Sequence, residues 1–91
     1  MTDTTRELPL LMGGGHGEPE RLLLIGVPDE HGRVQVRIWT SSDWSLPPRM
    51  RDETSGELLE SIESMSRAGH SLNQSLTTVR QWLHGVGMAA R

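Results

Sequence analysis

A helical stripe between residues 57 and 86 constrains the fold more than any other feature. Its members recur at alternating steps of four and three residues, which keeps them on one side of a helix with ~3.6 residues per turn. They are Leu58, Ile62, Met65, Gly69, Leu72, Leu76, Val79, Leu83 and Val86. Because all but the glycine are apolar, we expect the stripe to be covered by the rest of the chain or by another chain.

The first half of the stripe begins with a clear helix start. Thr54, followed by Glu57 three residues later, forms a capping box that can satisfy two backbone N–H groups at a helix N-terminus. We expect this helix to cover residues 55–68 and to end before Gly69, because glycine is common just past a helix C-terminus.

The second half of the stripe permits two interpretations. Ser71 with Gln74 forms another capping box, which predicts a separate helix over residues 72–84. The unbroken spacing through Gly69 instead favours one long helix, since a turn normally shifts the phase of such a pattern. The local residues favour two helices, and one long helix is the alternative.

A β-hairpin is predicted upstream of the helices. Residues 21–27 are apolar on both faces, which predicts a central strand, and residues 28–32 hold the Pro, Asp and Gly of a turn. Residues 33–40 alternate, which predicts a half-buried strand. Val34, Val36 and Ile38 would face one side, and Arg33, Gln35, Arg37 and Trp39 the other.

The remaining segments show no period. Residues 1–20 are acidic and include the glycine-rich run 13–17, so we expect a flexible tail. Residues 41–52 predict a long loop, and residues 85–91 a frayed end. The predicted architecture is α+β: one small domain over residues 21–84 with two strands followed by the helical part, which forms an oligomeric seam.

Composition narrows the possible functions. A chain of 91 residues without cysteine has no disulfides or thiolate metal sites. Its four histidines lie at positions 16, 31, 70 and 84, with none of the short spacings typical of metal sites, and no nucleophile motif is present. We therefore predict no cofactor, no metal and no enzymatic activity. No apolar run approaches the ~20 residues that span a membrane, so we expect a cytoplasmic protein with no membrane contact.

The favoured function is a small protein-interaction module: an adaptor, an accessory subunit or an inhibitor. A domain this small gains most from self-association, so we predict a homo-oligomer joined through the stripe residues Leu58, Ile62, Met65, Leu72, Leu76, Val79 and Leu83. Contacts to a further protein are predicted where Trp and Arg gather, because both are enriched at interfaces. The candidate contact residues are Arg33, Gln35, Arg37, Trp39, Trp44, Arg49 and Arg51.

DNA binding is the alternative function. The order of strand, helix, turn and helix over roughly residues 33–84 resembles the ribbon-helix-helix repressors, which pair one strand from each subunit in the major groove. The resemblance implies that Arg33, Gln35 and Arg37 read bases, and that the turn over residues 68–74 leads into a helix that contacts a phosphate. In that family the strand leads directly into the helix, whereas residues 41–52 intervene here.

Overall fold

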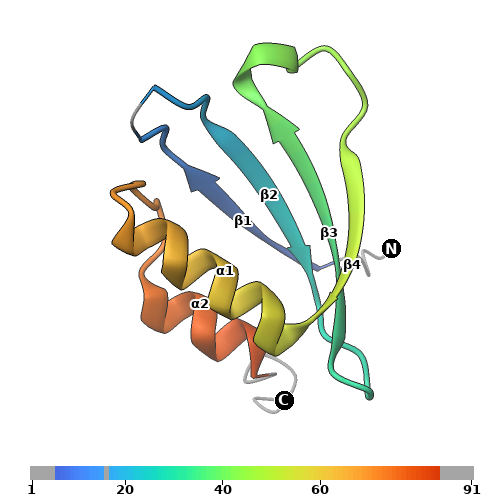
Figure 1. The fold of residues 1–91 in the computed structure, drawn as a ribbon. Coiled ribbons are helices and arrows are strands. Elements are labelled where there is room, and N and C mark those ends of the chain that lie inside the picture. The colour runs from blue at the N-terminus through green and yellow to red at the C-terminus, as the bar shows by residue number, and fades with distance from the viewer. Residues whose placement is uncertain (1–5, 16, 85–91) are drawn as a thin grey trace.

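The computed structural model describes residues 6–15 and 17–84, which form a four-stranded antiparallel sheet followed by two helices (Figure 1). The strands pair in chain order, β1 to β4, as a simple meander. The elements are β1 (Glu7–Met12), β2 (Arg21–Gly26), β3 (Arg33–Thr40), the short 3-10 helix η1 (Ser41–Asp43), β4 (Arg49–Thr54), α1 (Ser55–Arg67) and α2 (Leu76–Leu83). The predicted α+β class is confirmed.

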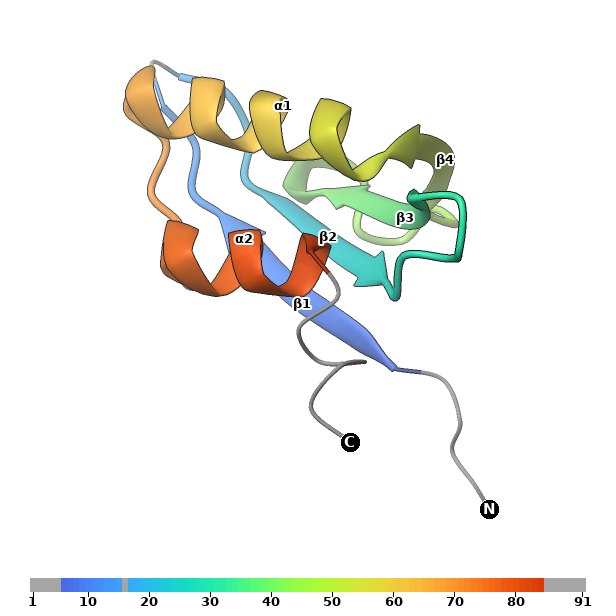
Figure 2. The same ribbon diagram turned by 90° about the horizontal axis from the view of Figure 1, so that it is seen from below.

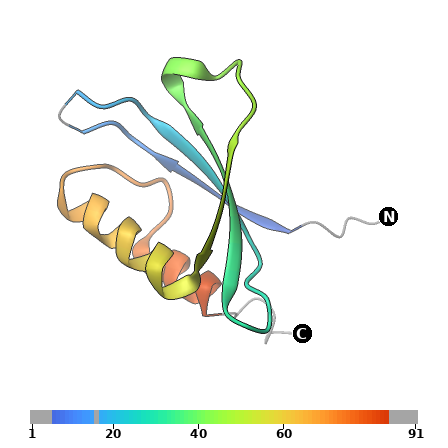
Figure 3. The ribbon, with the colours of Figure 1, turned by 45° about the vertical axis from the view of Figure 1, so that its right-hand side comes forward.

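Both helices lie on the same side of the sheet, as Figures 2 and 3 show from two directions. The core fills the space between these two layers and contains no buried polar side chain among the described residues. Alternate residues of β1, β2 and β3 face it, together with the inner faces of the helices. Its members are Leu10, Met12, Leu23, Ile25, Val34, Val36, Leu58, Ile62, Val79 and Leu83.

The predicted hairpin is present as β2 and β3. The two strands pair antiparallel, and Gly32 closes the turn with a positive φ of 76°, which glycine adopts without steric cost. Val34 and Val36 are buried, as the alternation predicts. On β2, however, only Leu23 and Ile25 are buried, because the helices cover a single face of the sheet.

The prediction of an unstructured tail over residues 1–20 is wrong for residues 7–12. These residues form β1, which pairs with β2 along its whole length. Pro9 argued against a strand, but β1 lies at the edge of the sheet, where a residue without an N–H is tolerated. Leu8, Leu10 and Met12 face the helices, and Leu10 and Met12 are fully buried.

The prediction of an aperiodic loop over residues 41–52 is also wrong in part. Residues 49–54 form β4, which pairs with β3 and leads directly into α1. The strand is hard to recognise because its first four residues are exposed and mostly charged. Charged side chains on an edge strand discourage pairing with other chains, so the composition fits the position.

Two helices form, and Gly69 separates them. Its φ of 106° places it in the left-handed region. The Gly69 and His70 N–H groups donate to the carbonyls of Ser66 and Met65, both at 3.1 Å, which is the Schellman arrangement at a helix C-terminus. The predicted helix end at Gly69 is confirmed, although α1 itself stops at Arg67, one residue before the predicted last residue 68.

The second helix begins later than predicted. Residues 71–74 are not its first turn, because they run along the outer edge of β1. Asn73 exchanges two hydrogen bonds with the backbone of Leu11, and Leu72 forms an isolated bridge with Met12. The N-cap of α2 is Ser75, whose Oγ accepts a 3.0 Å hydrogen bond from the Thr78 N–H.

The seven apolar stripe residues between 58 and 83 all pack into or against the core within one chain. Four of them are buried and the others pack against the core from partly buried positions: Leu58, Ile62, Val79 and Leu83 in the first group, and Met65, Leu72 and Leu76 in the second. The stripe keeps its phase through Gly69 because both helices lie on the same sheet. Val86 and the segment 85–91 lie outside the described residues, as do residues 1–5 and 16. Self-association through the stripe stays a prediction that no observation tests.

Candidate functional site

The face of the sheet that the helices leave uncovered is the first candidate site. Strand register places Arg37 between Leu24 and Met50, with Pro9 beyond Leu24, and this gives one row across all four strands. A second row joins Leu11, Leu22 and Trp39. We call this surface the open face, and its residues are Glu7, Pro9, Leu11, Leu22, Leu24, Arg33, Gln35, Arg37, Trp39, Met50 and Asp52.

Apolar side chains form the middle of the open face. Leu22, Leu24 and Trp39 are half-buried by their neighbours alone. Leu11 and Met50 are 40% and 61% exposed, which is high for residues of their size. The face is therefore neither a solvated polar surface nor a closed core.

The charges of the open face pair with one another. The Arg37 guanidinium donates to both Glu7 carboxylate oxygens, at 2.6 and 2.8 Å, and lies 5.7 Å from the centre of the Trp39 ring. Arg33 donates from Nε to Asp52 Oδ1 at 3.2 Å. Two guanidiniums thus meet two carboxylates, and the face has no charge excess of either sign.

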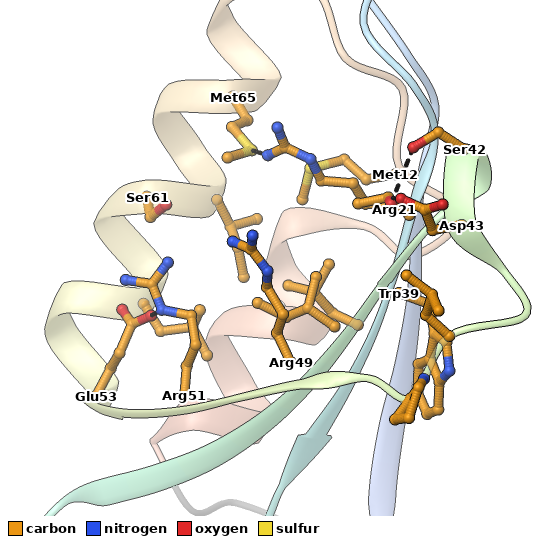
Figure 4. A pocket seen from close by; sticks show the side chains of 17 residues that line it. Met12, Arg21, Trp39, Ser42, Asp43, Arg49, Arg51, Glu53, Ser61 and Met65 are labelled. Atoms are coloured by element: carbon orange, nitrogen blue, oxygen red, sulfur yellow. Dashed lines mark hydrogen bonds and ion pairs between the residues drawn. The ribbon is translucent and has the colours of Figure 1, made fainter.

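A cavity of about 530 Å³ on the helix side of the sheet is the second candidate site. Arg49 and Arg51 of β4 and Arg21 of β2 reach into the space between the sheet and α1 (Figure 4). Apolar side chains form much of the wall, among them Leu23 and Ile62. We call this space the arginine cavity.

The structure divides the predicted contact residues among three places. Arg33, Gln35, Arg37 and Trp39 share the open face, as their alternation predicted. Arg49 and Arg51 lie on the helix side, at the arginine cavity. Trp44 stands apart in the connection that follows η1 and is 45% exposed.

Sequence reasoning missed the residues that β1 and β4 add. Pro9 and Leu11 belong to a strand that was predicted as tail, and Met50 to a strand that was predicted as loop. No alternation of polarity marks β4 in the sequence, because the consecutive residues Arg51, Asp52 and Glu53 are all charged. No local signal pointed to Arg21 as a cavity residue, because its neighbours there come from distant parts of the chain.

His70 has a structural environment rather than that of a metal ligand. His70 is almost fully buried, and its Nδ1 lies 2.9 Å from the Gly13 carbonyl, which ties the β1–β2 connection to the end of α1. Within the part of the chain that the structure describes, no three His, Cys, Asp or Glu side chains gather where they could hold a metal ion.

Comparisons with protein-family models, with curated proteins and with solved structures find no match to this chain. None of the helices formed by the described residues is long and apolar enough to cross a membrane.

Proposed function

We propose that this protein is a small interaction module that pairs with a second copy of itself through the open face. The observation that carries the proposal is the apolar middle of that face, to which all four strands contribute. Leu22 and Leu24 alternate with the buried Leu23 and Ile25 on the same strand, so β2 is apolar on both sides. Such a strand is typical of sheets that are covered on both faces.

The balance of charge favours a second copy as the occupant. A two-fold interface brings one patch against itself, so a patch of a single sign would repel its copy. The open face carries the Arg37–Glu7 and Arg33–Asp52 pairs and no net charge. In a dimer the Arg33–Asp52 pair can lie in the polar rim, whereas Arg37, between Leu24 and Met50, would enter the interface with its charge paired to Glu7.

Sheet geometry and chain size also favour a dimer through the open face. Two antiparallel sheets pack face to face at about 10 Å with their strands roughly aligned, and the inner faces supply a shared core. A domain of this size buries a small fraction of its surface alone and has no disulfide to compensate. Pairing through the open face would give the sheet a second covered face.

DNA binding receives less support. Its candidate base-reading residues Arg33 and Arg37 are held by Asp52 and Glu7, so contact with phosphate or base edges would require these pairs to break. β3 is hydrogen-bonded to a neighbouring strand on each side, so it has no free edge to pair with a second copy as a ribbon.

The test is the molar mass of the full chain by sedimentation equilibrium over a range of concentrations. The proposal predicts a reversible dimer for the natural protein. Leu24→Arg places a second, unpaired guanidinium beside Arg37 and should weaken dimerisation at least ~10-fold, because that charge would be desolvated in the interface. The variant should still fold, since Leu24 points away from the core.

Gln81→Arg is the matched control. It adds the same charge on α2, at an exposed position on the helix side of the protein. It should leave the dimer unchanged. A natural protein that stays monomeric, or equal dimerisation of the Leu24→Arg variant, would contradict the proposal, and DNA binding at low salt would support the alternative.

A further inference from the structure

β4 changes the character of the helix side of the sheet. The inward row of β3 is apolar, with Val34, Val36 and Ile38, whereas the residues opposite them on β4 are Glu53, Arg51 and Arg49. Inward-pointing charges on an edge strand often have no role beyond preventing the edge from pairing with another chain. Here they also border a cavity, so a second role can be tested.

The arginine cavity combines an apolar wall with an excess of positive charge. Met65 of α1, Ile38 of β3 and the exposed Leu46 supply accessible apolar surface, and the buried core residues Leu23, Leu58 and Ile62 lie behind it. Three guanidiniums and two carboxylates line it, whereas the whole chain has a net charge of −3. Its volume of about 530 Å³ lies within the range of about 300–1,000 Å³ that is typical of small-molecule sites.

The three guanidiniums differ in how far the protein satisfies them. The Arg51 Nε lies 3.0 Å from Glu53 Oε2, so Arg51 is neutralised within its own strand. Arg21 has weaker partners, with Glu18 Oε1 at 3.6 Å and the Met65 sulfur at 3.8 Å. No hydrogen bond or ion pair joins the Arg49 guanidinium to any residue that the structure describes.

Figure 4 shows the guanidiniums of Arg21 and Arg49 in the same space between α1 and the strands. Two cations in one space repel each other, and an anion between them would offset this repulsion by attracting both. Arginine binds carboxylate and phosphate groups through two parallel N–H···O bonds, which gives such an anion a defined orientation.

We propose that the arginine cavity binds a small amphipathic anion, with its charged head at Arg49 and Arg21 and its apolar body against Met65, Ile38 and Leu46. A carboxylate and a phosphate monoester share the required head chemistry. The site lies on the opposite side of the sheet from the open face, so it does not depend on the proposed dimer.

The test is a titration of the full chain at low salt. Binding is monitored through the backbone amide chemical shifts of Arg21, Ser61 and Met65 in NMR spectra. Octanoate, octyl phosphate and octan-1-ol serve as probes with the same apolar body. We expect saturable shifts with at least one of the two anions in the millimolar range. Octan-1-ol should bind at least ~10-fold more weakly, because its neutral hydroxyl can form neither an ion pair nor a bidentate contact with the guanidiniums. Tighter binding of one anion identifies the preferred head group.

Two variants decide whether Arg49 holds the head group. Arg49→Gln should weaken anion binding at least ~5-fold and should fold normally, since Arg49 is exposed and contributes to no ion pair among the described residues. Arg67→Gln removes an exposed guanidinium from the last turn of α1, outside both the arginine cavity and the open face, and should leave the affinity unchanged. The proposal is overturned if neither anion gives saturable shifts at the cavity, if octan-1-ol binds equally well, or if the Arg49→Gln variant binds the anions unchanged.

Discussion

At the scale of single residues, Gly69 decides the shape of the helical half. It adopts a φ of 106°, where a side chain meets the backbone. Gly69→Ala should therefore lower the free energy of unfolding by ~1–2 kcal/mol. Urea denaturation followed by circular dichroism measures this change.

Gly56→Ala is the matched control for that substitution. Gly56 lies in the first turn of α1, and a Cβ built there meets no atom within 4 Å. Alanine should stabilise this position by up to ~1 kcal/mol, because glycine loses more backbone entropy on folding. A stabilising effect at position 69 as well would favour one continuous helix and contradict the observed turn.

Asp29 gives the hairpin turn a pH dependence. Its Oδ1 accepts hydrogen bonds from the backbone N–H groups of Arg33 and His31, at 2.9 and 2.8 Å. The bond from Arg33 is the largest cause that lowers the pKa of this carboxyl below its ordinary value of 3.8, because it favours the charged form. A lowered pKa in the folded state means that the charged carboxylate stabilises the fold above pH 3.8, and that this contribution disappears as the pH falls through the folded-state pKa.

Asp29→Asn isolates this effect, because asparagine keeps an oxygen acceptor but does not titrate. The difference in unfolding free energy between the natural protein and the variant should be constant near neutral pH and should shift in favour of the variant in acid. Chemical denaturation at a series of pH values measures it. A difference that stays constant down to the acid limit would show that Asp29 titrates equally in the folded and unfolded chains.

At the scale of elements, the N-cap that α2 has in the structure differs from the N-cap that the sequence pattern favours. Ser75 caps the helix through its bond to the Thr78 N–H, so Ser75→Ala should cost ~1 kcal/mol of stability. The sequence pattern favours Ser71 as the cap. In the structure, however, Ser71 lies alongside the end of β1, where its backbone carbonyl accepts a hydrogen bond. Ser71→Ala should therefore change stability by less than ~0.5 kcal/mol. Thermal unfolding of both variants compares them, and a larger loss at Ser71 would contradict the observed boundary.

The elements that could be predicted are those with a strong local pattern. The hairpin had alternation on β3 and turn residues around Gly32, and α1 had a capping box at Thr54 with a glycine at its end. The two edge strands had neither. Pro9 disrupts the strand signal of β1, and charged residues conceal β4, because an edge strand need not be apolar on both faces.

The stripe shows why a correct pattern can lead to an untested conclusion. Its spacing identified the inner faces of both helices correctly, and the helix break at Gly69 was the favoured alternative. The pattern alone could not say what would cover it. The sheet does so here because β1 and β4 extend the predicted hairpin to four strands. The open face was predictable only in part. Its β3 residues could be identified from their alternation, whereas their neighbours on the open face of β1 and β4 could not.

At the scale of the whole molecule, the two sides of the sheet have different roles in our account. One side holds the core and the arginine cavity, and the other offers the apolar middle of the open face for pairing. If the dimer forms, its dissociation is linked to unfolding. The melting temperature of the natural protein should then rise with protein concentration, whereas that of the Leu24→Arg variant should not. Calorimetry at several concentrations measures this, and an equal response in both proteins would contradict the assignment.

The most direct test locates the contact itself. Isotope-filtered NOE spectra of a mixture of labelled and unlabelled chains report only contacts between copies. Our account predicts intermolecular NOEs that connect the methyl groups of Leu22, Leu24 and Met50 and the ring of Trp39 with the same residues of the second copy. Intermolecular NOEs confined to α1 and α2, or none in a concentrated sample, would contradict it.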